Sequence, residues 1–203
     1  MITLAIDTSS TRGSVAVVEE NGPVLFSEQF TADRTHSSLL FACLERALKV
    51  APRCARLAVG LGPGSYSGVR IALSAALGMQ LGMGAALCGI PSIVALETVE
   101  PEYQVIGDAR RGTFYFARVR AGKCGEGPLL LTAEELRGRL AASSLPVFAI
   151  EPVPEFPEAA LCRPSAEKLA RLAEQGHGTG DADRPLEPIY LREPHITQPR
   201  RDK

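Results

Sequence analysis

"ITLAIDTSSTRGSVAVVEENG", residues 2–22, has the pattern of a strand, a turn led by an acidic residue, and a second strand. Its Asn21-Gly22 pair is a hairpin signal. The stretch "YQVIGDARRGTFYFARVRAG", residues 103–122, repeats this pattern, with Asp108 in the place of Asp7. This internal repetition predicts two similar structural units in one chain.

The segments that follow each hairpin also resemble one another. After the first hairpin we expect a strand, a helix, a strand, a helix and a short strand, at 23–30, 36–50, 56–62, 67–84 and 86–89. After the second we expect a strand, a helix, a strand and a helix, at 127–131, 133–142, 145–150 and 165–175. Hairpins followed by alternating helices and strands predict an α/β fold of two tandem domains, at 1–97 and 98–203, with a Pro-rich tail.

Composition narrows the classes of function. The chain has 203 residues, 45% of them hydrophobic, and a formal net charge of -1, which argues against broad nonspecific nucleic-acid binding. Five scattered cysteines without a CxxC pair predict reduced thiols and a cytoplasmic protein, and the first residues do not resemble a signal peptide. Arg70 is the single charge between Leu57 and Leu96, but Gln80 and Pro91 interrupt that segment, so we expect a buried helix and no membrane span.

Two turns could hold a phosphate group. The first follows the opening strand and offers a carboxylate and three hydroxyls: Asp7, Thr8, Ser9 and Ser10. The alternative is that these groups only satisfy the backbone of the turn. The second is "GLGPGSYSGVRI", residues 60–71, which follows a strand and begins a helix. Gly62 and Gly64 lie in it, but it matches neither a P-loop nor a GxGxxG motif, and close helix–sheet packing is its alternative role.

No catalytic or metal-binding pattern is visible. The three histidines have no metal-ligand spacing, no GxSxG motif occurs, and Cys43 lies within an apolar helical run. We therefore expect no catalytic residues and no metal in this chain.

Two helices predict a partner surface. The helix at 36–50 has apolar residues on more than one face, and the helix at 67–84 is almost uncharged with several small residues. We expect both to lie side by side on one face of the first sheet and to present an apolar surface to a second protein. The second domain or the tail could cover this surface instead. The predicted interface residues are His36, Leu39, Leu40, Cys43, Val69, Arg70, Ala72, Leu73 and Ala76.

Four motifs together resemble the TsaB (YeaZ) family: "LAIDTSS" at 4–10, "GLGPGSYSGVRI" at 60–71, "IGDARRGTFY" at 106–115 and "PIYLRE" at 188–193. The resemblance implies two tandem domains of the actin/Hsp70/sugar-kinase (ASKHA) superfold, related to ribonuclease H. The second domain is short here and is expected to be reduced.

The resemblance also implies a function. It suggests a non-catalytic partner in making N6-threonylcarbamoyladenosine beside the anticodon of tRNAs that read codons beginning with A. Its partners would be a TsaD-type paralogue that transfers the threonylcarbamoyl group and a TsaE-type ATPase, with a homodimer when the paralogue is absent and tRNA contacted through the complex. No cofactor would be required, although ATP or ADP could bind weakly or at the partner interface. A small-molecule kinase is the enzyme alternative, and a metalloprotease lacks ligands for its metal.

Overall fold

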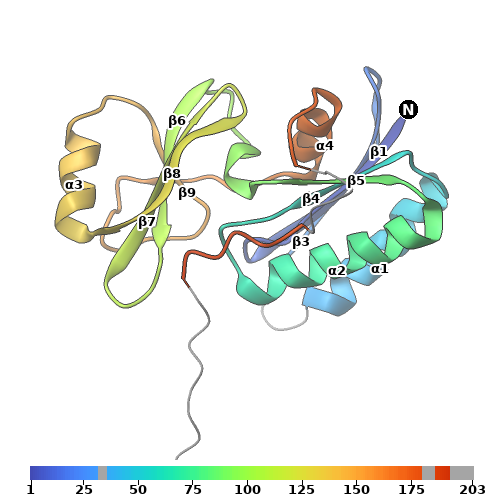
Figure 1. Cartoon of the computed structure of the whole chain (residues 1–203), viewed down its shortest axis with the longest axis horizontal. Coiled ribbons are helices and arrows are strands. Elements are labelled where there is room, and N and C mark those ends of the chain that lie inside the picture. The colour runs from blue at the N-terminus through green and yellow to red at the C-terminus, as the bar shows by residue number, and fades with distance from the viewer. Residues whose placement is uncertain (32–35, 180–185, 193–203) are drawn as a thin grey trace, which may run out of the picture.

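Two α/β domains lie side by side in the computed structural model, which describes residues 1–31, 36–179 and 186–192 (Figure 1). The first sheet contains β1 (Ile2–Asp7), β2 (Arg12–Glu19), β3 (Val24–Thr31), β4 (Arg56–Gly60) and β5 (Ala86–Ile90). The second contains β6 (Glu102–Asp108), β7 (Thr113–Arg120), β8 (Lys123–Thr132), β9 (Val147–Ala149) and β10 (Ala160–Leu161). The helices are α1 (His36–Val50), α2 (Tyr66–Met83), α3 (Ala133–Ala141) and α4 (Ala166–Glu174), with the 3-10 turn η1 (Ser92–Val94) between the sheets.

The two sheets share one topology, which confirms the predicted repeat. Their strand orders are β3-β2-β1-β4-β5 and β10-β9-β6-β7-β8. In each, the first three strands of the unit are antiparallel, and the fourth and fifth run parallel to the first. Asp7 and Asp108 end the equivalent strands β1 and β6. The fold therefore consists of two copies of the same α/β unit.

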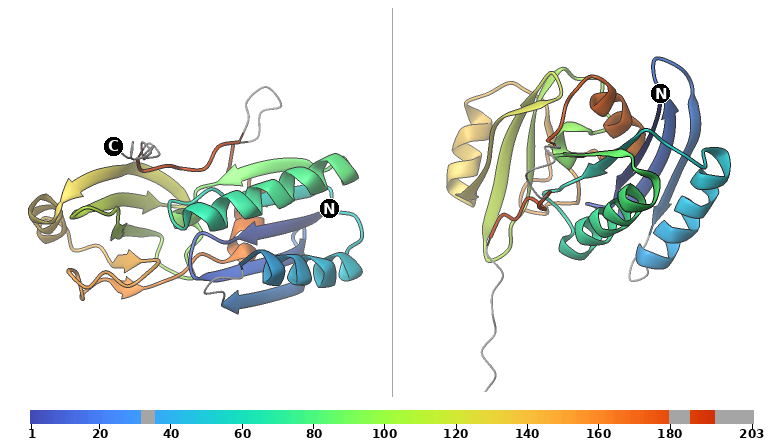
Figure 2. Two further views of the ribbon diagram at one scale, coloured as in Figure 1. Left: turned by 90° about the horizontal axis from the view of Figure 1, so that it is seen from below. Right: turned by 45° about the vertical axis from the view of Figure 1, so that its right-hand side comes forward.

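The first domain is a sheet covered on both faces (Figures 1 and 2). Helices α1 and α2 lie on one face, as the sequence predicts, and α4 lies on the other. All residues of β1 after Ile2 are buried, because this central strand has a helix layer on each side. Apolar residues of α1 and α2 form one core with Leu4, Ile6 and Val59 of the sheet.

Helix α4 belongs to the first domain in the structure, whereas the sequence pattern placed the helix at 165–175 in the second unit. This helix packs on β1, β2 and β4 of the first sheet. Ala5, Ala16 and Ala58 form the small-residue surface beneath it, and the backbone amide of Ala166 donates a hydrogen bond to the Ser14 hydroxyl at 2.9 Å. The chain thus returns to its first domain after completing the second sheet.

The second domain is the smaller unit, as expected. Strands β9 and β10 have three and two residues. The described residues between them, 150–159, contain no helix, whereas α2 occupies the equivalent place in the first domain. None of the helices that the structure describes is long and apolar enough to cross a membrane.

Alanine substitutions at two glycines of α2 test how closely this helix approaches the β1–β2 turn. A Cβ atom on Gly68 would lie 2.0 Å from the carbonyl oxygen of Thr8, whereas a Cβ on Gly78 would meet nothing within 4 Å. We expect Gly68→Ala to lower the free energy of unfolding by about 3 kcal/mol, because backbone must move. Gly78→Ala should raise it by up to about 1 kcal/mol, because alanine favours helix. Urea unfolding of both variants checks this, and equal effects would contradict the close approach.

Candidate functional site: a closed turn, an interdomain cleft and an outer helix face

The polar side chains of the β1–β2 turn form hydrogen bonds within the protein. Oδ1 of Asp7 accepts hydrogen bonds from the backbone amide of Ser9 at 2.9 Å and from the Ser9 hydroxyl at 2.7 Å. The Thr8 hydroxyl donates to the carbonyl oxygen of Gly68 at 2.7 Å, and the Ser10 hydroxyl donates to that of Arg12 at 2.8 Å. These hydroxyls are therefore engaged in fixing the turn.

The loop between β4 and α2 closes over this turn. The backbone amide of Ser65 donates to the carbonyl oxygen of Ser9 at 2.6 Å, and a Cβ atom on Gly64 would lie 2.1 Å from that oxygen. The backbone amide of Gly62 donates to the Ser92 hydroxyl at 3.0 Å. The Ser65 hydroxyl caps α2 by accepting from the amide of Gly68 at 3.2 Å. The amides of Gly62, Ser65 and Gly68 are thus used within the protein.

The predicted nucleotide-binding residues are mostly engaged within the protein. Five of the six are buried, and the sixth, Gly64, is exposed, lies against the backbone of the turn and lines the cleft between the domains together with Ser9. The buried five are Asp7, Thr8, Ser9, Ser10 and Gly62. The alternative that these groups satisfy their own turn agrees with the observed contacts.

Burial raises the pKa of Asp7 above its ordinary value, and the nearby hydroxyls of Ser92 and Ser9 oppose that rise. Oδ2 of Asp7 has no hydrogen-bond partner among the described residues and lies beside Gly60, where a Cβ atom would be 1.9 Å away. Burial of the carboxyl group therefore favours its neutral form, despite the donors around it.

The raised pKa of Asp7 predicts a stability change with pH. The folded protein keeps a proton on Asp7 at pH values where the unfolded chain has lost it, so this group's contribution to stability is lost as pH rises from about 4 through the raised pKa. Asp7→Asn removes the titration. The variant's free energy of unfolding, relative to wild type, should therefore increase between pH 4 and 7, by at most about 1.4 kcal/mol per pH unit. A difference that stays constant with pH would contradict this account.

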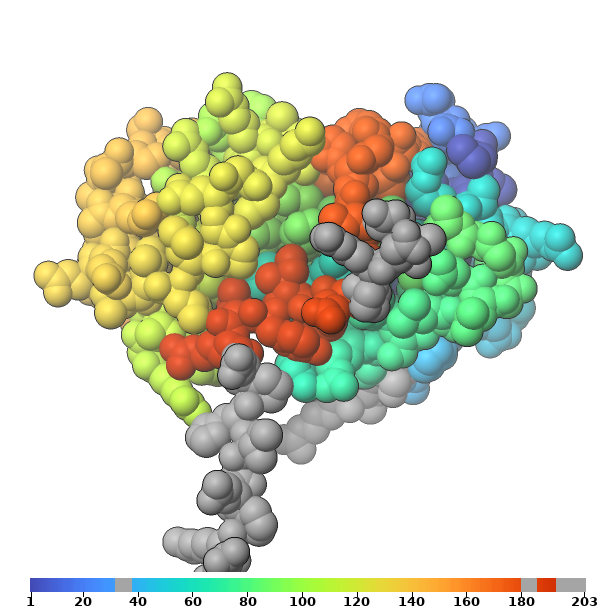
Figure 3. Space-filling view, in the orientation of Figure 1, coloured from blue at the N-terminus to red at the C-terminus, as the bar shows by residue number. Residues whose placement is uncertain are grey.

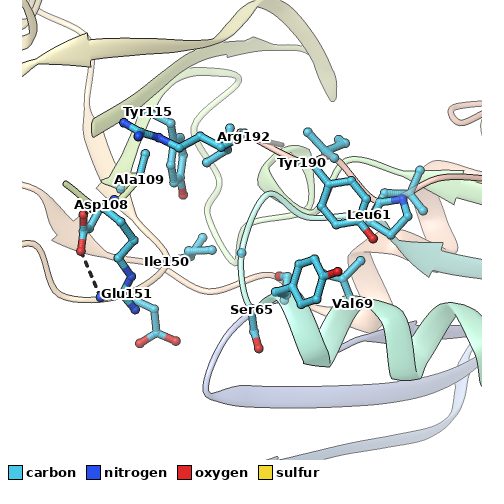
Figure 4. Close-up of a pocket in the computed structure, with 18 of the residues that line it drawn as sticks. Leu61, Ser65, Val69, Asp108, Ala109, Tyr115, Ile150, Glu151, Tyr190 and Arg192 are labelled. Atoms are coloured by element: carbon cyan, nitrogen blue, oxygen red, sulfur yellow. Dashed lines mark hydrogen bonds and ion pairs between the residues drawn. The ribbon is translucent and has the colours of Figure 1, made fainter. Parts of the chain in front are cut away.

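A cleft of about 820 Å³ separates the two domains. Leu61, Ser65 and Val69 line its wall on the first domain, and Ile150 and Glu151 face them from the second (Figure 4). The cleft is bridged at its base, because the Glu151 carboxylate accepts hydrogen bonds from the amide and the hydroxyl of Thr11, the latter at 3.2 Å. It is thus a preformed space with walls from both units.

The C-terminal segment 186–192 crosses the cleft, as the space-filling view shows (Figure 3). The amide of Ile189 donates to the carbonyl oxygen of Leu61 at 2.8 Å, and the rings of Tyr190 and Tyr66 lie 5.4 Å apart between centroids. Arg192 donates to the Thr113 hydroxyl on the second domain. The motif "PIYLRE" therefore contacts both domains, a role that sequence reasoning missed because nothing local to the motif indicates it.

Tyr115 lies on the second-domain side of the cleft. It pairs with Gly107 across β6 and β7, and its ring covers that glycine, where a Cβ atom would lie 2.2 Å from Cε1. Its hydroxyl is buried without a partner among the described residues. Burial raises the pKa of Tyr115, and the Glu151 charge adds to this, so the hydroxyl stays protonated and remains a donor.

Two tyrosines provide a matched comparison of stability. The Tyr103 hydroxyl donates to the carbonyl oxygen of Ile93 at 2.9 Å, whereas the Tyr115 hydroxyl has no such bond. We expect Tyr103→Phe to lower the free energy of unfolding by about 1 kcal/mol. Tyr115→Phe should leave it unchanged or raise it, since an unpaired buried polar group is removed. Thermal unfolding measures both, and a larger loss for Tyr115→Phe would contradict this assignment.

The outer face of α1 and α2 differs from the predicted interface. Five predicted residues are buried in the first domain's own core, because they face the sheet or the neighbouring helix: Leu40, Cys43, Ala72, Leu73 and Ala76. Val69 is also nearly buried, but it lines the cleft. Leu39 and Arg70 are exposed as expected, and the side chain of His36 lies outside the described residues. The exposed apolar residues of the two helices are Leu39, Phe41, Val50, Tyr66, Leu77 and Leu81. An exposed apolar face is therefore present. Helix α2 contributes Leu77 and Leu81 to it, whereas the predicted Ala72 and Ala76 are buried.

The part of the chain that the structure describes contains no cluster of His, Cys, Asp and Glu that could hold a metal. All five cysteines are free. In the second domain, the turn equivalent to Asp7–Ser10 has Asp108 exposed and paired with Arg110 at 3.3 Å. The second turn therefore lacks the hydroxyls of the first, whose hydroxyls are bonded within the protein.

The sequence of this chain is similar to those of known proteins. Residues 30–126 match the family model of TsaD, tRNA N6-adenosine threonylcarbamoyltransferase. An uncharacterized protein of Mycobacterium tuberculosis is 29% identical over 205 residues, covering 94% of this chain and 92% of that protein.

Solved structures extend the similarity to the whole fold. A Pseudomonas aeruginosa structure described as an uncharacterized protein with similarity to peptidase YeaZ superposes with a TM-score of 0.74 at 25% identity, covering 94% of this chain and 99% of that one. YeaZ from Pseudomonas aeruginosa superposes with a TM-score of 0.69 at 23% identity over the same shares. The predicted fold of two tandem ribonuclease H-like domains is therefore confirmed.

Proposed function

We propose, from the premise that this chain contains a glycoprotease/TsaD family domain and has a YeaZ-type fold, that it is a non-catalytic partner subunit in tRNA modification. The reaction is the synthesis of N6-threonylcarbamoyladenosine next to the anticodon of tRNAs that read codons beginning with A. The chain binds a TsaD-type transferase, and a TsaE-type ATPase joins the complex.

The outer face of α2 is the observation that carries this proposal. Leu77 is 42% exposed and Leu81 is 88% exposed, on a helix whose single charged residue is Arg70. Added Cβ atoms on Gly78 and Gly82 would meet nothing within 4 Å, so the helix backbone is open next to each of these leucines. An uncharged helix surface with exposed leucines and glycines suits close packing against another helix. Helix α1 lies beside it on the same face and adds Leu39 and Phe41.

A subunit without its own chemistry agrees with the closed β1–β2 turn. A kinase of this fold would need the phosphates of ATP near Asp7, where the protein's own backbone lies. A nucleotide required by the complex would then bind at the interface with a partner or on the ATPase. The same helix face would form a homodimer when the paralogue is absent, and tRNA would be contacted through the complex in the cytoplasm.

A charge on the outer face of α2 tests the proposal. We expect Leu77→Glu and Leu81→Glu to fold normally, since both side chains are exposed in the free chain. Each should weaken binding to the organism's TsaD-type protein by about tenfold or more, because a carboxylate would be buried without a partner. Co-purification and calorimetry measure the binding, and the yield of modified tRNA measures the consequence.

The matched control is Leu130→Glu. Leu130 is 41% exposed, close to the value for Leu77, but lies on β8 of the second domain. This variant should bind the TsaD-type protein as wild type does. Full binding by both α2 variants, or equal loss in the control, would place the interface elsewhere.

A further inference from the structure

The turn between β6 and β7 holds two consecutive arginines in a backbone conformation that favours glycine. The φ angle is 66° at Arg110 and 57° at Arg111, both in the left-handed region. A residue with a side chain is strained there relative to glycine. Oδ1 of Asp108 stabilises the turn by accepting from the backbone amide of Arg110 at 2.6 Å. Folding alone would therefore favour glycine at both positions, and strained arginines point to a function of their side chains.

The arginine side chains at this turn face solvent. The side chain of Arg110 is 87% exposed, and its ion pair with Asp108 at 3.3 Å stays within the turn. Arg111 is exposed and forms no ion pair with any residue that the structure describes. Arg192 of the C-terminal segment is also exposed and donates to the hydroxyl of Thr113, where β7 begins. Three guanidinium groups therefore gather at the turn, and one of them has an acidic partner.

Exposed aromatic rings lie next to these arginines. Tyr66 is 51% exposed and Tyr190 is 44% exposed, and the guanidinium of Arg70 lies 5.0 Å from the centroid of the Tyr66 ring. The β6–β7 turn, the C-terminal segment and the first turn of α2 follow one another along the lower edge of the molecule (Figure 3). Arginines beside exposed rings suit RNA, because guanidinium groups bind phosphates and unpaired bases stack on aromatic side chains.

We propose that this edge contacts RNA when the chain is bound to the TsaD-type transferase. The arginine edge, as we call it, consists of Tyr66, Arg110, Arg111, Tyr190 and Arg192. Its arginines bind the phosphate backbone, and its tyrosines stack on an unpaired base. The inference rests on the proposed function, which makes tRNA the substrate of the complex.

Two features of the chain agree with a contact made within the complex. The formal net charge of -1 gives the chain no general attraction for RNA, so the arginine edge would add to binding by the transferase. Tyr66 begins α2, whereas the exposed Leu77 and Leu81 lie in its second half. The transferase can therefore occupy the outer helix face while RNA contacts the other end of the helix.

Arg111→Gly tests the arginine edge, because it removes one guanidinium and relieves the strained backbone. We expect the midpoint of thermal unfolding to rise by about 2–4 °C. The affinity of the complex for tRNA should fall about fivefold or more, and the slope of log affinity against log salt should become shallower by about 1. Fluorescence anisotropy with labelled tRNA at several salt concentrations measures both quantities.

Three further variants separate strain, charge and stacking. Ala121→Gly relieves a left-handed residue with φ 47° in the β7–β8 turn, so it should stabilise the chain and leave tRNA affinity unchanged. Arg120→Gln removes a side chain that is 77% exposed at the other end of β7, and tRNA affinity should again be unchanged. Tyr190→Ala should weaken tRNA binding about fivefold or more without changing the salt slope, because the lost ring is neutral.

Binding to the transferase, measured on the same preparations, separates this proposal from the proposed function. If the wild-type chain does not bind the transferase, the proposed function fails, and the isolated chain at low salt must then bind tRNA more tightly than Arg111→Gly. Equal tRNA binding by wild type and Arg111→Gly, an equal loss with Arg120→Gln, or no tRNA binding in either setting would overturn the arginine edge. Weaker binding of Arg111→Gly to the transferase would also overturn it, because the turn would then contact a protein.

Discussion

The contact between the β1–β2 turn and the start of α2 is the constraint on which the first domain depends. The amide of Ser65 donates to the Ser9 carbonyl at 2.6 Å, and the Thr8 hydroxyl donates to the Gly68 carbonyl at 2.7 Å. These bonds require glycine at 64 and 68, where a Cβ atom would collide with backbone. They fix the rotation of α2 and so decide that Ala72 and Ala76 face the core while Leu77 and Leu81 face outward.

Two surfaces remain available once this turn is closed. One is the outer face of α1 and α2, which is apolar at Leu77 and Leu81 and suits a protein partner. The other is the cleft between the domains, which is lined by aromatic and charged residues of both. They lie at different places on α2, since its first turn lines the cleft and its second half carries the leucines. Binding at one surface can therefore be measured without altering the other.

Local sequence patterns predicted the elements well, because strands, hairpins and helix caps depend on neighbouring residues. The repeat of Asp7 and Asp108 gave the correct topology, and helix α1 begins and ends where its pattern predicts. Packing between elements that are far apart in the sequence was harder to predict. Helix α4 returns to the first sheet because Ala5, Ala16 and Ala58 offer it a flat surface, and no local signal shows this. The sequence also did not show which face of α2 packs on the sheet, because a helix with apolar residues on all sides has no preferred buried face. Tyr115, Tyr190 and Arg192 were within quoted motifs, but their meeting in the cleft depends on the arrangement of both domains.

The claim at the centre of this account is that Asp7 is structural and that the chain acts as a partner. The most direct measurement is the yield of N6-threonylcarbamoyladenosine in a reaction reconstituted from the TsaD-type transferase, the TsaE-type ATPase, tRNA and their small-molecule substrates. We predict no product without this chain, and equal product with the wild-type chain and with a folded Asp7→Asn variant. Product formed without the chain, or lost with folded Asp7→Asn although that variant still binds its partner, would contradict the account.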